Sequence, residues 1–314
     1  MPTMSVPKTQ SIAFSIGLRR LLRHFPYTEM LALFLPIYAY LYVQGRIKSP
    51  FTLLLMLPFI FADAAGFVYN NISDIKDDPY MKANPLVRGE ISLARARIVL
   101  GISLALSIIS FLLLYKTSVA RLVYFAYLFL CLAYSGLGVR FKETLAGPLV
   151  AAFIIWVGGP FILLTEFNNF DPVTIGLVLG SWLVFIGREI LHTISDYESD
   201  MHSGYRTFAV RVGLRISGWL QNIAFIAGAM FLTGSLYAYF GGWSINTINV
   251  LLSTMVVLSV AAQLVASLSN HLLDPRAAYF LIRVFYIAYA GVILQFPPLV
   301  VLMFVWAFCT TKRS

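Results

Sequence analysis

Acidic residues gather in two short segments of this sequence. The chain has 14 Asp and Glu among 314 residues. Four of them lie between Asp63 and Asp78, and four more lie between Glu189 and Asp200. Both segments end long apolar runs, where an acid that faces lipid is costly. Their concentration at two points therefore indicates one shared polar site.

The polar residues of each segment recur every four residues, so they share one face of a helix. The first set is Asn70, Asp74 and Asp78, with Asp63 seven residues earlier, and the second is His192, Asp196 and Asp200. Like charges on one face repel each other unless a cation lies among them. Oxygen ligands favour a hard cation, Mg²⁺ before Zn²⁺, and Mg²⁺ completes its shell with water and phosphate oxygens. Two such faces opposite each other would hold a diphosphate between metal ions.

A single segment of this kind is equally well explained as a solvated helix end that pairs with nearby Lys and Arg. Two segments with the same spacing, each entered from an apolar helix, favour the site.

Membrane helices are the elements that must position these residues. The chain is 59% hydrophobic and 12% charged, with a mean hydropathy of +0.81, whereas soluble domains carry about 25% charged residues. A helix needs ~20 apolar residues to cross a bilayer, and nine apolar runs near that length predict nine spans. All nine are expected to be helices, since an open sheet edge cannot face lipid. The runs are 27–45, 51–73, 93–115, 120–138, 145–165, 172–194, 214–239, 247–268 and 277–310, the last broken at Pro297 and Pro298.

Basic residues predict the orientation of these helices. Of the 23 Lys and Arg, 17 lie in the N-terminal tail or in loops after even-numbered spans. Positive residues mark the cytoplasmic side, so the N-terminus and both acidic segments are predicted to be cytoplasmic. We expect a multi-pass protein with one domain over 1–314, a cytoplasmic tail 1–25 and no cleavable signal. The net charge of +9 is a topology signal and gives no reason to expect nucleic acid binding.

The residues of these segments resemble the UbiA superfamily of intramembrane prenyltransferases. The stretch Asn70 to Asp78 matches that family's NxxxDxxxD motif, and Asp196 to Asp200 matches its DxxxD motif. Further similarities lie at 84–92, at Tyr134-Ser135 with Arg140 and Lys142, at Arg188-Glu189-Ile190 and at 204–213. The resemblance covers the second to seventh predicted spans in the family's order.

The resemblance implies an all-α membrane bundle of about nine helices around a central cavity. It also implies an enzyme that moves a prenyl group from an isoprenyl diphosphate donor to a lipophilic acceptor in the membrane, with release of diphosphate. The implied cofactor is Mg²⁺. The residues expected to hold the metal and the diphosphate are Asn70, Asp74, Asp78, Asp196 and Asp200.

Basic and aromatic side chains complete the expected site. The candidates for contacting the diphosphate are Arg140, Lys142, Lys82, Arg88 and Arg206. Each of them alone is equally well explained as a positive-inside anchor. Tyr69, Tyr134 and Tyr197 lie next to the motifs and are candidates for stabilising an allylic cation, although each one alone is better explained by packing or by the interfacial belt of aromatic residues.

Asp63 and His192 are candidates for roles beyond metal binding. Asp63 lies about two turns inside the second span, where a carboxylate needs a partner. It could orient Asn70, bind the acceptor, accept the acceptor's proton or make a structural hydrogen bond. His192 could act as a base near neutral pH.

The sequence departs from the family pattern at a few positions. Asn84 stands where an Arg usually precedes Pro85. Lys82 or Arg88 would then take over the contact that this Arg makes with phosphate. His192 and Thr193 replace a Lys and an Asp that are common upstream of the second motif. These changes bear on the acceptor more than on the metal.

Two other functions remain open from the sequence. A UbiA-type terpene cyclase would use the same metal site without an acceptor. A transporter would place its acids near the middle of the bilayer and use paired broken helices, whereas here only Asp63 lies deep.

Overall fold

The computed structural model describes residues 18, 21, 27–75 and 84–240, which are helices joined by short loops, with no strand among them. The prediction of an all-α membrane bundle is confirmed. Each of the first seven predicted spans coincides with helical structure. Most of the N-terminal tail and the two last predicted spans lie outside the described residues, as do Asp78 and Lys82.

Most of the long helices correspond to single predicted spans. They are α2 (Tyr27–Val43), α3 (Leu57–Ser73), α4 (Leu93–Leu114), α5 (Ser118–Ala133), α8 (Pro172–Ser195) and α11 (Leu214–Phe240). The 3-10 helix η1 (Pro50–Met56) leads into α3. The fifth predicted span is one helix in three parts, namely α6 (Gly147–Ala152), the π-helical η3 (Phe153–Val157) and α7 (Gly158–Phe167). Short elements follow α5 and α8, namely η2 (Phe141–Glu143), α9 (Tyr197–Ser203) and α10 (Phe208–Val212).

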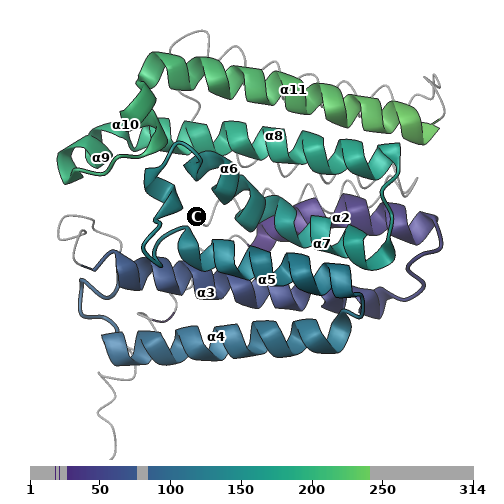
Figure 1. Ribbon diagram of the computed structural model, residues 1–314, viewed down its shortest axis with the longest axis horizontal. Helices are drawn as coiled ribbons and strands as arrows, with labels where there is room; N and C mark the ends of the chain where they lie inside the picture. Colours follow the sequence, from purple (N-terminus) through teal and green to yellow (C-terminus); the bar gives the residue numbers. More distant parts are fainter. Residues whose placement is uncertain (1–17, 19–20, 22–26, 76–83, 241–314) are drawn as a thin grey trace, which may run out of the picture.

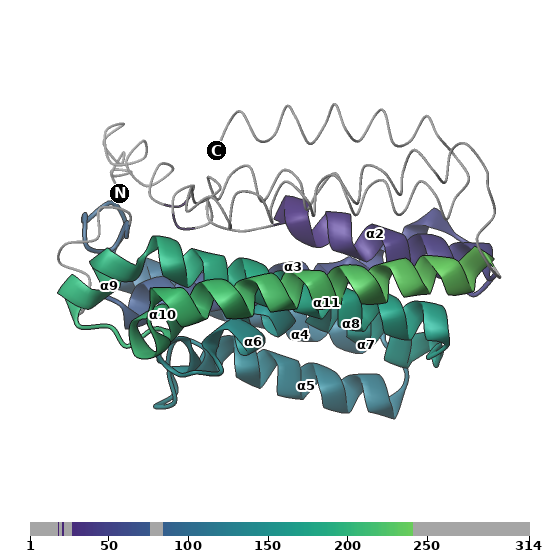
Figure 2. The ribbon, with the colours of Figure 1, turned by 90° about the horizontal axis from the view of Figure 1, so that it is seen from above.

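The long helices run side by side with their axes nearly aligned (Figures 1 and 2). The pair α3 and α4 forms one side of the bundle in Figure 1 and the pair α8 and α11 forms the other, with α5, α6 and α7 between them. In the described part, five helical segments are long and apolar enough to cross a membrane. The short helices α9 and α10 gather at one end of the bundle, away from the α2–η1 loop.

Aromatic side chains fill the core between α3, α4 and α5. The Phe111 and Tyr124 rings stack with centroids 3.7 Å apart, and the edge of Phe59 meets the Tyr127 ring at 5.7 Å. The buried Tyr hydroxyls have partners, as a buried polar group requires. Tyr124 shares a 2.5 Å hydrogen bond with Ser107. This core fixes the position of α5, which carries part of the cavity wall described below.

Glycines bring α8 and α11 into close contact. A Cβ atom on Gly180 would lie 2.9 Å from the carbonyl oxygen of Gly228, and one on Gly228 would lie 2.8 Å from the carbonyl oxygen of Gly180. Neither position has room for a side chain. Small residues at helix contacts are typical of membrane proteins, where close packing of backbones stabilises the bundle. The contact holds α8 in place. The end of α8 that is predicted to face the cytoplasm carries the second acidic segment.

Candidate active site

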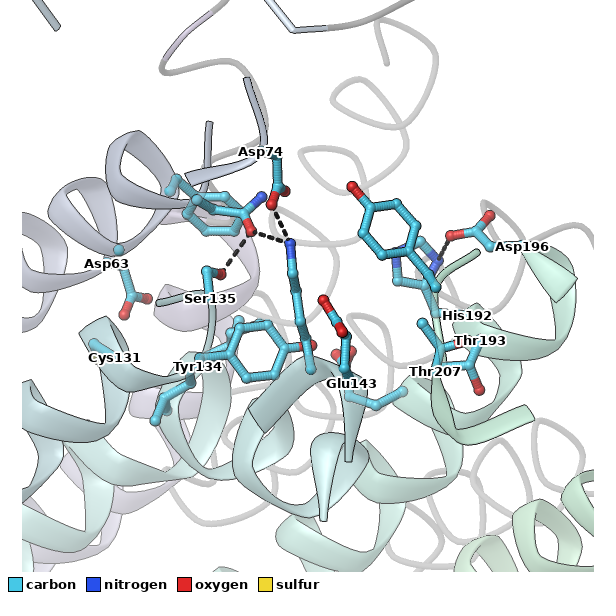
Figure 3. A pocket seen from close by; sticks show the side chains of 18 of the residues that line it. Asp63, Asp74, Cys131, Tyr134, Ser135, Glu143, His192, Thr193, Asp196 and Thr207 are labelled. Carbon is cyan, nitrogen blue, oxygen red and sulfur yellow. Dashed lines mark hydrogen bonds and ion pairs between the residues drawn. The ribbon is translucent and has the colours of Figure 1, made fainter. Parts of the chain in front are cut away.

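A cavity of about 440 Å³ lies between α3, the end of α5, the η3 segment and α8. The helix α9 and the loop after it complete the wall through Asp200, Tyr205 and Thr207. Along α3 the lining residues run from Asp74 at the helix end to Asp63 inside the span. Figure 3 shows the two acidic segments on opposite sides of the cavity. The volume is within the range of small-molecule sites, roughly 300–1,000 Å³.

Asn70 and Asp74 form the polar part of the α3 wall, one turn apart as their spacing predicts. Asp74 is the residue that ends α3, so its carboxylate lies beyond the last turn of the helix. The Lys142 ammonium donates to Asp74 Oδ1 at 2.5 Å and to Asn70 Oδ1 at 3.3 Å. Ser135 Oγ also donates to Asn70 Oδ1, at 2.6 Å. The first motif is therefore already bonded to a cation of the protein.

The loop between α5 and α6 brings two basic side chains to the first motif. Arg140 has a left-handed backbone with a φ of 48°, which turns the chain into η2. The Lys142 amide then donates to the Tyr134 carbonyl at 3.0 Å and closes the loop. Arg140 Nη2 lies 3.3 Å from Asp74 Oδ1, and its Nε lies 2.9 Å from Glu143. Tight turns of this loop thus place Arg140 and Lys142 beside one carboxylate.

The second motif lies at the end of α8 and in α9. His192 Nδ1 is 3.4 Å from Asp196 Oδ2, one turn away, as the four-residue step predicts. Asp200 is buried and accepts a 2.7 Å hydrogen bond from Thr207 Oγ1. Burial raises the pKa of the Asp200 carboxyl above its usual range; the Thr207 hydrogen bond opposes this shift, and the nearby Asp196 carboxylate adds to it. A carboxylate in this position is poised to gain from a bound cation.

The part of the cavity inside the span is mostly apolar. Phe67 of α3 and the η3 residues Ile154, Ile155 and Trp156 line it. The π-helical turn presents three consecutive residues of one segment to the cavity, and such turns are frequent at functional sites. An apolar space next to a charged one suits an amphipathic ligand with a charged head and a hydrocarbon chain.

A profile of the UbiA prenyltransferase family matches residues 32–282 of the chain. The chain belongs to this family. The match includes α3, α5, α8 and α9, which carry the cavity wall, so the resemblance of the motifs and the geometry of the site agree.

Individual relatives are distant. The chain is 27% identical over 184 residues to a digeranylgeranylglyceryl phosphate synthase of Sulfurisphaera tokodaii, covering 58% of this chain and 64% of that protein. It is 29% identical over 175 residues to a 4-hydroxybenzoate octaprenyltransferase of Legionella pneumophila, covering 53% of this chain and 58% of that protein. The chain thus matches less than two thirds of the length of either relative.

A solved structure confirms the fold. The structure of a UbiA homolog from Archaeoglobus fulgidus bound to DMAPP and Mg²⁺ superposes with a TM-score of 0.65 at 20% identity. The similarity covers 88% of this chain and 98% of that one. The family's helical bundle is therefore present here.

The structure brings most of the predicted site residues together. Those on the cavity wall are Asp63, Asn70, Asp74, Tyr134, Lys142, His192, Asp196 and Asp200. Arg140 reaches the site through its contact with Asp74.

Three of the predicted residues do not lie on this wall. Arg88 pairs with Glu90 at 3.6 Å in the loop before α4, and Arg206 is exposed on the loop before α10. Tyr197 packs against an apolar cluster that includes Ile190 and Phe208. The helical turn at Tyr197 points its ring to this cluster, while Asp196 and Asp200 line the cavity.

A buried ion pair on α8 was not among the predicted site residues. Arg188 and Glu189 are buried, form an ion pair and line the cavity. Trp156 Nε1 donates to Glu189 at 3.2 Å, and its ring lies 5.6 Å from the Arg188 guanidinium. Two opposite charges inside an apolar span were the available signal, because such residues usually serve a function. Ser135, Glu143, Tyr205 and Thr207 are further lining residues that were not among the predicted site residues, although Ser135, Tyr205 and Thr207 lie in stretches that resemble the family.

Proposed function

We propose that this protein is a Mg²⁺-dependent intramembrane prenyltransferase that moves a prenyl group from an isoprenyl diphosphate to a lipophilic acceptor and releases diphosphate. Family membership supports the reaction class. Two relatives are named as a synthase and an octaprenyltransferase, and the Archaeoglobus fulgidus homolog was solved with DMAPP and Mg²⁺. The family match over 32–282 also supports a single domain over those residues.

The observation that carries the proposal is the division of the cavity into a charged part and an apolar part. Asp74 lies on one side and Asp196 on the other (Figure 3), and Asp200 of the second motif also lines the cavity. Lys142 and Arg140 add positive charge at the same end. A prenyl diphosphate has the matching division into a charged head and a hydrocarbon chain, and its head would bind at the charged end.

The chemistry of the donor atoms fits Mg²⁺. Carboxylate and amide oxygens from Asn70, Asp74, Asp196 and Asp200 would hold it, with Asp78 as the predicted ligand outside the described residues. Among the described residues no three His, Cys, Asp or Glu lie close enough to enclose a metal ion. Mg²⁺ takes one or two carboxylates and completes its shell with water and phosphate oxygens, so each wall of the cavity would need to supply only one or two of these groups. When bound, Mg²⁺ would neutralise charge that develops on the diphosphate.

The basic residues of the α5–α6 loop would act on the leaving group. Donor binding would turn the Lys142 ammonium and the Arg140 guanidinium from Asp74 toward the diphosphate oxygens. The allylic C–O bond breaks, and its electron pair leaves with the diphosphate, which these cations stabilise. An electron pair of the acceptor forms the new bond to the allylic carbon, and the acceptor loses a proton. Tyr134, a candidate for stabilising the allylic cation, lines the same cavity.

The apolar walls would protect the allylic cation from water. Phe67, Ile154, Ile155 and Trp156 offer no nucleophile and leave little room for solvent beside a prenyl chain. Exclusion of water prevents hydrolysis of reactive intermediates.

We further propose that the charged end of the cavity faces the cytoplasm. The loops that carry Arg140, Lys142 and Arg206 belong to the side with 17 of the 23 basic residues. The positive-inside rule supports this orientation.

The test is product analysis by mass spectrometry on the full chain in lipid. The protein would receive Mg²⁺ and geranylgeranyl diphosphate, with and without a pool of aromatic and alcohol acceptors. Transfer and diphosphate release should require an acceptor and should fall at least 100-fold in Asp74→Asn, the scale of losing a group that organises transition-state charge. The exposed Glu198→Gln on α9 is the matched control and should keep full turnover.

The other outcomes of this experiment are equally informative. An Asp74-dependent cyclic hydrocarbon made without an acceptor would identify a terpene cyclase instead. Full turnover of Asp74→Asn would contradict the proposed site.

A further inference from the structure

Asp63 is a buried carboxylate that the proposed diphosphate site does not use. It is 4% exposed but lines the cavity between α3 and α5 (Figure 3). Tyr127 donates a 2.7 Å hydrogen bond to its Oδ1 atom. Its Oδ2 atom is buried and has no hydrogen-bond partner within the described part of the chain. Leaving a buried carboxylate oxygen without a donor is costly, so a bound molecule that supplies a donor would be stabilised here.

Packing fixes the position of the Tyr127 hydroxyl. The Tyr127 ring is fully buried and occupies the space where Gly158 of α7 lacks a side chain, because a Cβ there would lie 2.5 Å from the ring. The edge contact with Phe59 holds another side of the ring. Residues of α3, α5 and α7 thus hold Tyr127 against Oδ1 of Asp63, and Oδ2 is the oxygen of this cavity residue that still lacks a donor.

The depth of Asp63 indicates which substrate it would meet. Asp63 precedes Asp74 by 11 residues on α3, which is about 16 Å along a helix axis. A diphosphate bound near Asp74 cannot span that distance. Gly66, Phe67 and Cys131 line the space around Asp63. The prenyl chain of the donor carries no hydrogen-bond donor, so the molecule that satisfies Oδ2 would be the acceptor.

We propose that Asp63 and Tyr127 form a recognition site for a neutral hydroxyl group of the acceptor. Oδ2 of Asp63 accepts the hydrogen bond from that hydroxyl, and Tyr127 holds the carboxylate in position. Burying a charged group beside Asp63 would be costly, so the part of the acceptor that reaches it is uncharged. This inference rests on the proposed transferase function and names its acceptor class, a lipophilic phenol or alcohol.

Binding of matched probes tests the inference without turnover. The full chain in lipid nanodiscs would be titrated with 1-naphthol and with 1-methoxynaphthalene, which lacks the hydroxyl proton. A second arm would use 1-O-octylglycerol and its dimethyl ether, so that the two arms separate a phenol from an alcohol. Apparent Kd values follow from the rise in Tm with probe concentration. In at least one arm the hydroxyl probe should bind about 3-fold to 10-fold more tightly than its ether, as expected for one hydrogen bond to a buried carboxyl oxygen.

Substitutions assign this preference to Asp63 and Tyr127. Asp63→Leu keeps the branched shape of the side chain and has no acceptor atom, so the preference should fall to about 1. Asp63→Asn keeps one neutral oxygen and should retain part of the preference. Tyr127→Phe should lower the preference several-fold. Tyr124→Phe is the matched control, because Tyr124 is equally buried one turn away but bonds Ser107 outside the cavity, and it should keep the full preference.

The results separate this inference from the proposed function. Equal binding of hydroxyl and ether probes in both arms, or an unchanged preference in Asp63→Leu, would overturn the recognition site even if prenyl transfer is found. A preference that depends on Asp63, in a protein that transfers no prenyl group, would overturn the transferase and keep the site. A cyclic hydrocarbon whose formation needs Asp63 and no acceptor would assign Asp63 to the donor and overturn the inference.

Discussion

Among the described residues, Lys142 is the cation closest to Asp74 of the first motif. Its ammonium bonds both Asp74 and Asn70, and its side chain is 14% exposed. A bound diphosphate would offer it charged oxygens on the open side of the cavity. The ammonium therefore holds the two motif residues in place before the donor binds and would stabilise the leaving group afterwards.

Loss of this ammonium should weaken use of the donor. A hydrogen bond to a charged group contributes about 1.5–3 kcal/mol, so Lys142→Gln should lower kcat/KM for the prenyl diphosphate about 10-fold to 100-fold. Steady-state kinetics at varied concentrations of the prenyl diphosphate would measure this change in kcat/KM. Lys116→Gln is the matched control, because Lys116 lies just before α5, whereas Lys142 lies in the loop that follows the other end of that helix. This control should leave kcat/KM unchanged. Equal kcat/KM values for Lys142→Gln and the unaltered protein would remove Lys142 from the site.

Thr207 positions Asp200, so its loss should weaken Mg²⁺ binding more than binding of the prenyl diphosphate donor. Thr207→Val removes the 2.7 Å hydrogen bond to Asp200, which is worth about 1 kcal/mol. The Mg²⁺ concentration for half-maximal activity should therefore rise about 5-fold, with little change in kcat at saturating Mg²⁺. Thr207→Ser keeps the hydroxyl and should restore the Mg²⁺ dependence. A loss of kcat with unchanged Mg²⁺ dependence would argue against this role.

The sequence predicted side chains on one helix better than contacts between helices. The four-residue steps placed Asn70 with Asp74, and His192 with Asp196, because helix geometry alone decides which residues share a face. The left-handed turn at Arg140 has no comparable local signal. The bond between Trp156 and Glu189 depends on how η3 packs against α8, so it could not be foreseen from either segment.

The glycine contact between α8 and α11 should decide how well the second motif is held. Gly180→Leu would force its side chain into the Gly228 backbone, and overpacking of this kind costs about 1–3 kcal/mol. We expect a lower Tm and a loss of turnover, measured by thermal unfolding in detergent and by product formation. Gly218→Leu on α11 is the matched control, since a Cβ there meets no atom within 4 Å. Equal Tm values for both variants would show that the close contact is not required.

Helix boundaries followed from hydropathy because lipid leaves the backbone few alternatives. The predicted spans 93–115 and 172–194 correspond to Leu93–Leu114 and Pro172–Ser195. The interruptions within spans were not predicted. The π-helical segment Phe153–Val157 and the 3-10 helix Pro50–Met56 consist of residues as apolar as their neighbours, so their geometry reflects packing rather than composition.

The whole molecule unites two motifs that lie more than a hundred residues apart in the sequence. Asp74 and Asp196 each follow a long helix, and those helices run so that both motifs come to the same end of the bundle (Figure 1). An even number of crossings between the motifs predicted this, because it returns the chain to one side of the membrane. The distance between the two walls depends on the packing of every helix between them, which no local pattern encodes.

This end of the bundle should face the cytoplasm, and single cysteines can test it. Glu198 is exposed on α9 at the charged end, whereas Gln44 is exposed in the α2–η1 loop at the opposite end (Figures 1 and 2). With Cys131 and Cys309 replaced by Ala, Glu198→Cys should react with a membrane-impermeant maleimide only in inverted vesicles. Gln44→Cys should react only in right-side-out vesicles, so each variant controls for the other. The expectation rests on the excess of Lys and Arg on the α9 side. The reverse labelling pattern would place the diphosphate site on the outer face of the membrane. A prenyl diphosphate made in the cytoplasm could not reach the site there without transport.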